Sequence, residues 1–305
     1  MNAISVENLS KKYKEQLAVD NISFEVKEGE FFAFLGENGA GKSTTINMLC
    51  TILEKTSGCV HIAGYELGVE DDEIRKNIGI VFQNSVLDNK LTVKENLYTR
   101  GAYYGLSKKE IEARLSPFMD KFKLEEILNK KHEKLSGGQR RRIDIIRALI
   151  HAPKILFLDE PTTGLDPMSR KMVWDYIEFL RKERQMTIFL TTHYMEEVKD
   201  ADSVVILDKG RIIAQDTPAG LKSSFANGKL IWYTTAGEEA AGLLKNTFSE
   251  FEYDVDHYTI SLKEQEFDVT GYLYENREKI KNYEVIKGNL DDVFLNLTGR
   301  KISEE

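Results

Sequence analysis

A glycine-rich loop at residues 36–44 constrains the fold of this chain more than any other stretch. Its sequence is Gly-Glu-Asn-Gly-Ala-Gly-Lys-Ser-Thr, which fits the pattern of a glycine, four residues and then Gly-Lys-Ser. The apolar run at 31–35 predicts a buried strand before the loop, and residues 44–49 predict a helix after it. Glycines let the backbone close around a phosphate, and a helix start adds N–H donors and the positive end of its dipole. The loop therefore predicts a phosphate-binding site between a strand and a helix.

The polar residues at the end of this loop suit the chemistry of a bound nucleotide phosphate. Lys42 brings a full positive charge to the outer phosphates, and the hydroxyl of Ser43 can hold Mg²⁺. Consecutive backbone N–H groups of the loop bind anionic oxygens. A chance glycine-rich turn is the alternative, and the flanking strand and helix argue against it. The residues expected to bind the phosphates are Gly36, Glu37, Asn38, Gly39, Ala40, Gly41, Lys42, Ser43 and Thr44.

Polar residues follow three further apolar runs that predict strands, which are residues 78–82, 155–158 and 187–190. Gln83 follows the first run, Asp159 and Glu160 follow the second, and His193 comes shortly after the third. In open α/β sheets, ligands bind at the carboxyl ends of the strands. One carboxylate can hold Mg²⁺, and the other can orient or deprotonate an attacking water. Each residue alone has an ordinary structural explanation, but after a phosphate loop the set predicts a hydrolytic site.

A second pair of glycines occurs in the stretch Leu135–Gln139. Ser136 is a good N-cap, and Gly137 and Gly138 expose backbone N–H groups at the start of the helix that follows. This stretch predicts a second anion-binding site. The three arginines at 140–142 could contact nucleic acid, but on a helix we expect them to form a solvated, salt-bridged face.

Length and composition limit the class of protein. The 305 residues allow two domains of ordinary size, and 41% hydrophobic residues are ample for packed cores. No apolar run approaches the roughly 20 residues that a membrane span needs, and the N-terminus lacks a signal pattern, so we expect a soluble intracellular protein. Residues 230–305 contain 8 basic and 16 acidic residues and so carry the whole net charge of −8. An acidic tail argues against nucleic acid as a partner.

The order of predicted elements suggests how the chain is divided. From residue 88 to about 146 the pattern becomes helical, and Thr92 with Glu95 has the spacing of a capping box. Residues 223–228 are small and polar, so we expect a domain to end near 225 and another to begin near 229. Residues 229–305 mix strand and helix patterns, which predicts a small α+β domain of about 75 residues.

Taken in this order, the motifs resemble those of the nucleotide-binding subunit of ATP-binding-cassette (ABC) transporters. The resemblance covers residues 1 to about 225, and the stretches 159–167, 191–197 and 290–300 are most similar to ABC-2-type exporters of drugs, antibiotics or sodium. It implies an α/β fold with a P-loop, RecA-like core, an antiparallel β subdomain and a helical subdomain. The ABC ATPase domain would span 1–225, and a small C-terminal α+β accessory domain would span 229–305.

The family resemblance also implies roles for single residues. Tyr13 would stack on adenine, although an ordinary loop tyrosine is an equal alternative. Glu160 would be the general base, and His193 would contact the γ-phosphate. The implied catalytic residues are Glu160, His193, Lys42 and Gln83; Mg²⁺ and its waters would be arranged by Ser43, Gln83 and Asp159; and ATP would be bound by Tyr13, Gly36–Thr44, Ser136, Gly137, Gly138, Gln139 and Asp166.

The same resemblance implies partners. Two copies would form a head-to-tail homodimer, in which Ser136, Gly137 and Gly138 of one copy bind the γ-phosphate of ATP held by the other, with Asp166 at the seam. The dimer would drive integral membrane permease subunits from the cytoplasmic face of the cell membrane. Two alternatives are a soluble ABC ATPase acting on DNA or ribosomes, and a regulatory subunit that binds ATP without hydrolysing it. The first typically carries long insertions or two cassettes, and the second would have lost Glu160 or a residue of the stretch Leu135–Gln139.

Overall fold

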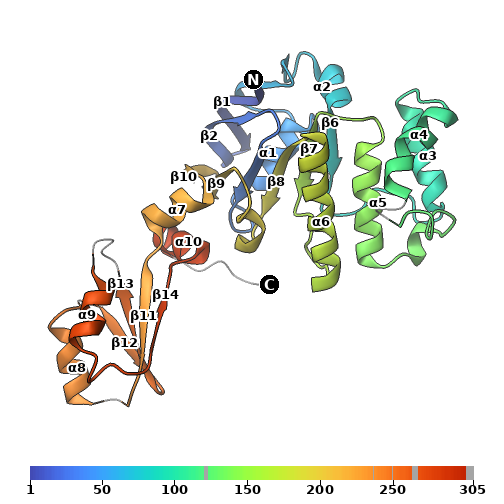
Figure 1. Cartoon of the computed structure of the whole chain (residues 1–305). Coiled ribbons are helices and arrows are strands. Elements are labelled where there is room, and N and C mark those ends of the chain that lie inside the picture. Colours follow the sequence, from blue (N-terminus) through green and yellow to red (C-terminus); the bar gives the residue numbers. More distant parts are fainter. Residues whose placement is uncertain (120–122, 236, 249, 263–266, 300–305) are drawn as a thin grey trace. The chain divides into compact units, whose positions relative to one another are not determined.

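The structure is a computed structural model of the chain, and it describes residues 1–119, 123–235, 237–248, 250–262 and 267–299. Contacts divide the chain into two compact units, Met1–Gln215 and Asp216–Glu305 (Figure 1). None of the helices in the described ranges has the length and apolar character that a membrane crossing requires.

A six-stranded sheet forms the centre of the first unit. Its order is β10-β9-β3-β8-β7-β6, and the neighbours from β9 to β6 pair in parallel. The strands β3, β7 and β8 are buried along their whole length, as expected for a sheet that is covered on both faces. The strand bounds are β3 Phe31–Leu35, β6 Ile78–Val81, β7 Ile155–Asp159, β8 Thr187–Thr192, β9 Ser203–Asp208 and β10 Arg211–Asp216.

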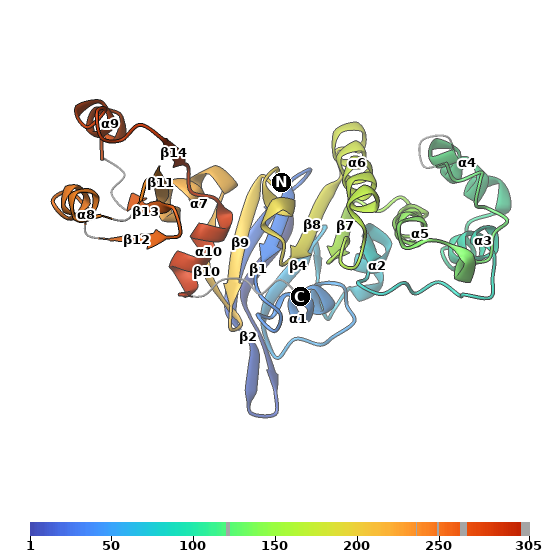
Figure 2. The same cartoon turned by 90° about the horizontal axis from the view of Figure 1, so that it is seen from below.

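An antiparallel sheet of order β2-β1-β4-β5 packs against this centre, which confirms the predicted β subdomain. The ring of Phe24 on β2 lies 5.3 Å from that of Phe32 and 4.9 Å from that of Phe34 on β3, so aromatic packing joins the two sheets. The strands are β1 Asn2–Tyr13, β2 Gln16–Lys27, β4 Ser57–Ile62 and β5 Tyr65–Glu66, with helices α1 Lys42–Leu49 and α2 Asp71–Asn77 in the same part of the chain. The β1–β2 hairpin extends past the end of the other sheet (Figure 2).

Helices dominate between β6 and β7, as the sequence predicts. Thr92 accepts a hydrogen bond from the backbone N–H of Glu95 and forms a complete capping box, which confirms the predicted helix start. Helices α5 and α6 pack side by side, and α3 and α4 lie beyond α5 (Figure 1). The helices between β6 and β7 are α3 Val93–Tyr103, α4 Lys108–Met119, η1 His132–Lys134 and α5 Gly137–Leu149, whereas α6 Pro167–Arg184 follows β7 and η2 Met195–Val198 follows β8.

The second unit is a small α+β structure, as predicted. Its sheet has the order β12-β13-β11-β14, and its neighbouring strands pair antiparallel. Buried residues of the sheet, such as Leu230 and Trp232, share a core with Leu244 and Leu273 from two helices. The elements are α7 Pro218–Phe225, β11 Gly228–Tyr233, α8 Glu238–Lys245, β12 Phe251–Asp254, β13 His257–Leu262, α9 Val269–Glu275, β14 Tyr283–Ile286 and α10 Leu290–Thr298.

Two local expectations differ from the structure. Residues 218–225, placed in the first domain from the sequence, form α7 of the second unit, because α7 packs on α10 and Asn296 donates a hydrogen bond to the carbonyl of Phe225 at 2.7 Å. Tyr13, expected in a loop, is the last residue of β1 and pairs with Gln16. Domain limits at 225 and 229 stay a prediction.

Candidate nucleotide site

The phosphate loop runs from the end of β3 to the start of α1. At Gly41, φ is 107°, and a Cβ there would lie 2.7 Å from the carbonyl oxygen of Ala18. A Cβ at Gly36 would lie 2.5 Å from the carbonyl oxygen of Leu207. Both positions therefore require glycine, because the neighbouring backbone leaves no room for a side chain. The loop has the tight path that lets backbone N–H groups surround an anion.

Lys42 lies buried inside the loop. Its Nζ donates hydrogen bonds to the carbonyl oxygens of Gly36 at 2.8 Å and Glu37 at 3.0 Å. The same atom lies 3.5 Å from Oε1 of Glu160. Burial lowers the pKa of Lys42, and the nearby charge of Glu160 opposes this effect. The ammonium is thus placed where the anionic oxygens of a phosphate would find a partly desolvated positive charge.

Glu160 is the point at which the four predicted catalytic residues meet. Its Oε2 accepts hydrogen bonds from Gln83 and from Thr163, each at 3.2 Å. Its Oε1 faces Lys42 and lies 3.4 Å from Nδ1 of His193. This Nδ1 is buried and makes no hydrogen bond within the part of the chain that the structure describes. The parallel strands β6, β7 and β8 thus bring three distant polar residues together with the loop lysine, as the sequence predicts.

The backbone of Glu160 is unusual. Its φ is 44°, in the left-handed region that residues with a side chain rarely adopt. Such a conformation costs about 1–3 kcal/mol and persists only where surrounding contacts hold it. The N–H of Glu160 donates to the carbonyl oxygen of Thr191 on β8 at 3.0 Å. Strain at one residue beside a phosphate loop marks this position as functional.

The residues expected to arrange Mg²⁺ have suitable chemistry. The hydroxyl of Ser43 donates to Oδ1 of Asp159 at 3.4 Å, and Thr191 donates to the same oxygen at 2.5 Å. Burial raises the pKa of Asp159, and these hydrogen bonds oppose the change. In the described residues, no group of three or more His, Cys, Asp or Glu could hold a metal. A hydroxyl, an amide and one carboxylate still fit Mg²⁺, which usually keeps waters and takes further oxygens from substrate phosphates.

A cavity of about 330 Å³ opens beside the loop, within the range of small-molecule sites. Four of its residues were missed from the sequence, because only the β1–β2 hairpin and the loop after β9 bring them there: Gln16, Leu17, Ala18 and Lys209. The other residues around the cavity were predicted, and they are Asn38, Gly39, Gly41, Lys42, Ser43, Thr44, Gln83 and Glu160. Tyr13 does not line the cavity, and this residue is 46% exposed. Its role at adenine stays a prediction.

The second glycine pair lies at the start of α5, away from this cavity's lining. Ser136 and Gln139 form a reciprocal capping box, so Ser136 is the N-cap that the sequence predicts. Asp166 caps α6 and accepts two hydrogen bonds from Ser169, at 3.0 and 2.6 Å. A Cβ at Gly138 would lie 2.4 Å from Oγ of Ser169. The structure therefore brings Asp166 and the glycine pair together as a group of their own.

The arginines that follow the glycine pair do not form the expected solvated face. Arg141 and Arg142 are only 6% and 7% exposed. The guanidinium of Arg141 donates to backbone carbonyl oxygens, including that of Glu160 at 3.0 Å. The expectation was wrong because the partners of Arg141 are main-chain acceptors, which leave no mark on the sequence.

Glu197 on η2 is a second buried charge that the sequence does not single out. It accepts hydrogen bonds from the hydroxyls of Thr162 and of Thr192, the latter at 2.5 Å. Burial raises its pKa, and these hydrogen bonds oppose the shift. Thr162 follows Glu160 closely and Thr192 precedes His193, so Glu197 joins the two segments that carry these residues.

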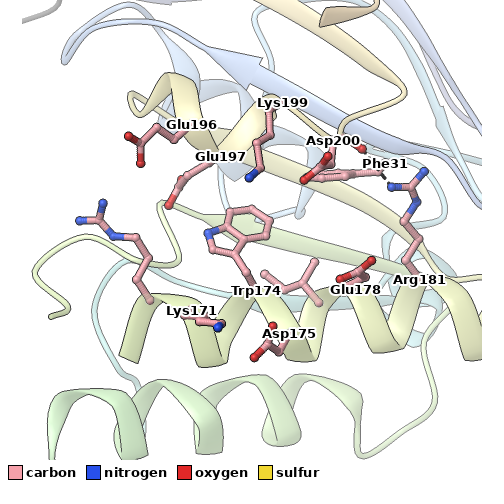
Figure 3. Close-up of a pocket in the computed structure, with 12 residues that line it drawn as sticks. Phe31, Lys171, Trp174, Asp175, Glu178, Arg181, Glu196, Glu197, Lys199 and Asp200 are labelled. Atoms are coloured by element: carbon pink, nitrogen blue, oxygen red, sulfur yellow. Dashed lines mark hydrogen bonds between the residues drawn. The ribbon is translucent and has the colours of Figure 1, made fainter. Parts of the chain in front are cut away.

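A further cavity of about 330 Å³ lies between α6, η2 and the start of β3 (Figure 3). Trp174 projects into it from α6, and Glu197 and Lys199 approach from the opposite side. Its walls carry charges of both signs and none of the predicted site residues. It is therefore separate from the nucleotide site.

Comparisons with known proteins point in the same direction. The profile of the family described as ABC transporter matches residues 19–163. The linearmycin resistance ATP-binding protein LnrL of Bacillus subtilis is 38% identical, and the alignment covers 99% of this chain and 100% of that protein. The daunorubicin/doxorubicin resistance ATP-binding protein DrrA of Streptomyces peucetius is 35% identical, with 97% of this chain and 92% of DrrA covered.

Solved structures are similar as well. An ATP-binding subunit of an ABC transporter has a TM-score of 0.66 and 32% identity, and the match covers 73% of this chain and 93% of that one. A dimeric ATP-binding cassette in a post-hydrolysis state, bound to ADP and Pi, has a TM-score of 0.64 and 30% identity, with 70% and 98% covered. The chain therefore belongs to the ABC transporter family, in which it is an ATP-binding and ATP-hydrolysing subunit.

Proposed function

We propose that the chain is the motor subunit of an exporter, bound to integral membrane permease subunits on the cytoplasmic face of the cell membrane. The support comes from relatives that match nearly the whole chain, including its second unit. They are named as linearmycin resistance, daunorubicin/doxorubicin resistance and Nod factor export ATP-binding proteins. A soluble ATPase acting on DNA or ribosomes is not favoured by these relatives. The cargo would be selected by the membrane subunits.

In the proposed reaction, water attacks the γ-phosphate of ATP and ADP leaves. Glu160 would accept a proton from the attacking water, because its carboxylate is buried at the carboxyl end of β7 and faces the cavity. Lys42 and the loop N–H groups would bind the phosphate oxygens, and the buried Nδ1 face of His193 would contact the γ-phosphate. Mg²⁺, held by Ser43, Gln83 and Asp159 through oxygen atoms and waters, would neutralise phosphate charge.

The observation that carries the dimer is the separation of two anion-binding helix starts. The cavity beside α1 is lined by loop residues and Glu160, whereas Ser136, Gly137 and Gly138 at the start of α5 do not line it. We infer that a second copy supplies its α5 to this cavity, in a head-to-tail homodimer that encloses two Mg-ATP. The similar dimeric cassette supports this arrangement. ATP binding would then close the dimer, and hydrolysis would loosen it.

The test uses a variant that binds ATP without turnover. Purified Glu160→Gln protein, with its membrane companion supplied in a parallel sample, is measured by light scattering after size exclusion in saturating Mg-ATP. A dimer is expected in Mg-ATP and a monomer with ATP and EDTA. The matched control is Glu160→Gln combined with Lys42→Ala, which should stay monomeric because the phosphate site is lost. If Glu160→Gln stayed monomeric in Mg-ATP both with and without the membrane companion, although nucleotide was bound, the dimer would be refuted.

A further inference from the structure

Arg141 lies in the second turn of α5, three residues after Gly138, and its guanidinium is buried against two strand ends. Its Nε donates to the carbonyl oxygen of Pro161 at 2.5 Å, and Nη2 donates to those of Glu160 at 3.0 Å and Asp159 at 3.2 Å. Nη1 donates to the carbonyl oxygen of Phe82. One side chain of α5 thus holds the segment before Gln83 and the turn that contains Glu160.

These carbonyl oxygens need a partner at this place. The parallel ladder between β6 and β7 ends at the pair Val81 and Leu158, so the next carbonyl groups point beyond the ladder. Buried main-chain acceptors without a donor are costly, and native structures almost always satisfy them. The planar guanidinium has five N–H donors in a fixed fork and can serve both strand ends at once.

The same contacts explain how Glu160 keeps its left-handed backbone. Arg141 binds three consecutive carbonyl groups, those of residues 159, 160 and 161. Rotation of the Glu160 backbone toward an ordinary conformation would turn these groups away from one rigid plane. Strained residues persist where their surroundings over-determine them, and Arg141 supplies that constraint from α5.

The charge of Arg141 is also accounted for. Asp144, Asp159 and Glu197 act on it electrostatically and favour its ionised form, against the effect of burial. A neutral side chain at this position would leave these carboxylates without that compensation. The position therefore requires both the charge and the forked shape of arginine.

We propose that Arg141 is a positioning residue for ATP hydrolysis, which ties the Glu160 turn and the segment before Gln83 to α5. This inference rests on the proposed function, because it takes Glu160 as the base and α5 as the element that binds the partner's ATP. A shift of α5 when it engages that nucleotide is then transmitted to Glu160 and Gln83 of its own protomer. Arg141 reaches no reacting atom itself.

The experiment compares two arginines of the same helix. Arg141→Lys keeps the charge but cannot bridge both strand ends with one ammonium group. Arg147→Lys is the matched control, since Arg147 is 4% exposed and donates to the carbonyl oxygen of Ile80 at 2.5 Å but does not contact the Glu160 turn. Both variants are examined in the full chain for thermal unfolding, ATP affinity by calorimetry, and kcat and KM for phosphate release.

The two substitutions should reduce thermal stability to a similar extent, but only Arg141→Lys should lower kcat, by tenfold or more, with an ATP affinity within about threefold of wild type. Arg141→Gln loses the charge as well as the fork, so it should lower kcat at least as much, and it serves if the lysine variant does not fold. Adding Arg141→Lys to Glu160→Gln should cause less than a twofold further loss, because Arg141 acts through Glu160. Equal kcat values for Arg141→Lys and Arg147→Lys would overturn the inference, as would multiplicative losses in the double variant. Full turnover by Glu160→Gln alone would instead refute the proposed function.

Discussion

Replacement of Glu160 by glutamine tests the proposed chemistry most directly. Glutamine has nearly the same shape and can still accept a hydrogen bond from Gln83 or Thr163, which now donate to Oε2 of Glu160 at 3.2 Å. It cannot accept a proton from water. A positioned general base contributes about 10²–10⁴-fold to a rate. At about 1.36 kcal/mol for each factor of ten, the activation barrier should rise by about 2.7–5.4 kcal/mol.

The binding of ATP should change much less than the rate. The Nζ of Lys42 lies 3.5 Å from Glu160, so the substitution removes one nearby negative charge from the lysine. The hydrogen bonds from Lys42 to the loop carbonyl groups do not involve Glu160 and should remain. Phosphate oxygens would then supply the opposing charge. We expect the dissociation constant for Mg-ATP to stay within about threefold, since exchanging one anionic partner of the lysine for another is a small net change.

The assay measures phosphate release and, in parallel, ATP binding by calorimetry. Glu126→Gln is the control, because Glu126 is exposed and lies outside the nucleotide cavity. It should match wild type in both measurements. A Glu160→Gln variant with kcat within threefold of wild type would refute the assignment of the base. A parallel loss of ATP affinity and rate would show instead that the substitution had damaged the phosphate site.

Two further predictions concern other parts of the first unit. A methyl group at Gly137 would meet Leu165 no closer than 3.4 Å, whereas one at Gly138 would lie 2.4 Å from Oγ of Ser169. Gly138→Ala should therefore destabilise the protein by about 1–3 kcal/mol through overpacking, as measured by urea unfolding. Gly137→Ala should retain the stability of the wild type but lose turnover and, in size exclusion with Mg-ATP, dimer formation. Wild-type turnover by Gly137→Ala would contradict the proposed interface. Burial lowers the pKa of His151 from 6.5 to about 4, and its ring stacks on Tyr104. Between pH 6.5 and about 4 the imidazole of His151 is protonated in the unfolded chain but neutral in the folded one. The contribution of neutral His151 to the free energy of unfolding is therefore complete above pH 6.5 and is lost as the pH falls toward 4. Allowing for partial exposure, His151→Gln should abolish about 1–2 kcal/mol of this acid destabilisation, and an equal stability difference between variant and wild type at pH 7.5 and pH 4.5 would contradict it.

The central part of the site could be predicted because its information is local. The phosphate loop is a contiguous motif, and its glycines are required by close backbone contacts at Gly36 and Gly41. Gln83, Glu160 and His193 each follow an apolar run. Once these runs are parallel strands of one sheet, their carboxyl ends must meet at one edge. The structure places the side chains of Gln83 and His193 beside the carboxylate of Glu160, as this rule requires.

The supports of the site could not be predicted in the same way. Arg141 binds main-chain carbonyl groups of two distant segments, and Glu197 binds two threonine hydroxyls. A run of three arginines on a helix and a pair of glutamates are both typical of solvated surfaces. Only the folded structure shows that carbonyl acceptors at the strand ends are placed to bind Arg141 and that two threonine hydroxyls are placed to donate to Glu197.

The remaining errors have similar causes. The pairing of β1 with β2 contains several register shifts, and these decide which hairpin residues reach the cavity; alternation of apolar residues does not specify them. Helix α7 does have a local signal, since Thr217 caps it and Pro218 occupies its first turn. The small residues at its end suggested a linker, and its packing on α10 outweighed that composition.

The positions of Arg141 and Glu197 bear on why hydrolysis would depend on a second copy. Both are buried charges, and they hold the Glu160 turn from two sides, one from α5 and one from η2. Glu160 itself is held by Gln83, Thr163 and the neighbouring lysine, so its carboxylate is ordered within one chain. The start of α5 does not line this cavity. The helix that fixes the Glu160 turn thus carries its glycine pair outside the cavity of its own chain. If the proposed dimer is correct, each protomer therefore supplies an ordered base for its own nucleotide and the missing anion-binding helix start for its partner's. The side chain of Arg141 joins these two roles, because it connects α5 to the Glu160 turn. Binding of the partner's nucleotide by α5 and alignment of Glu160 in its own site therefore cannot be independent.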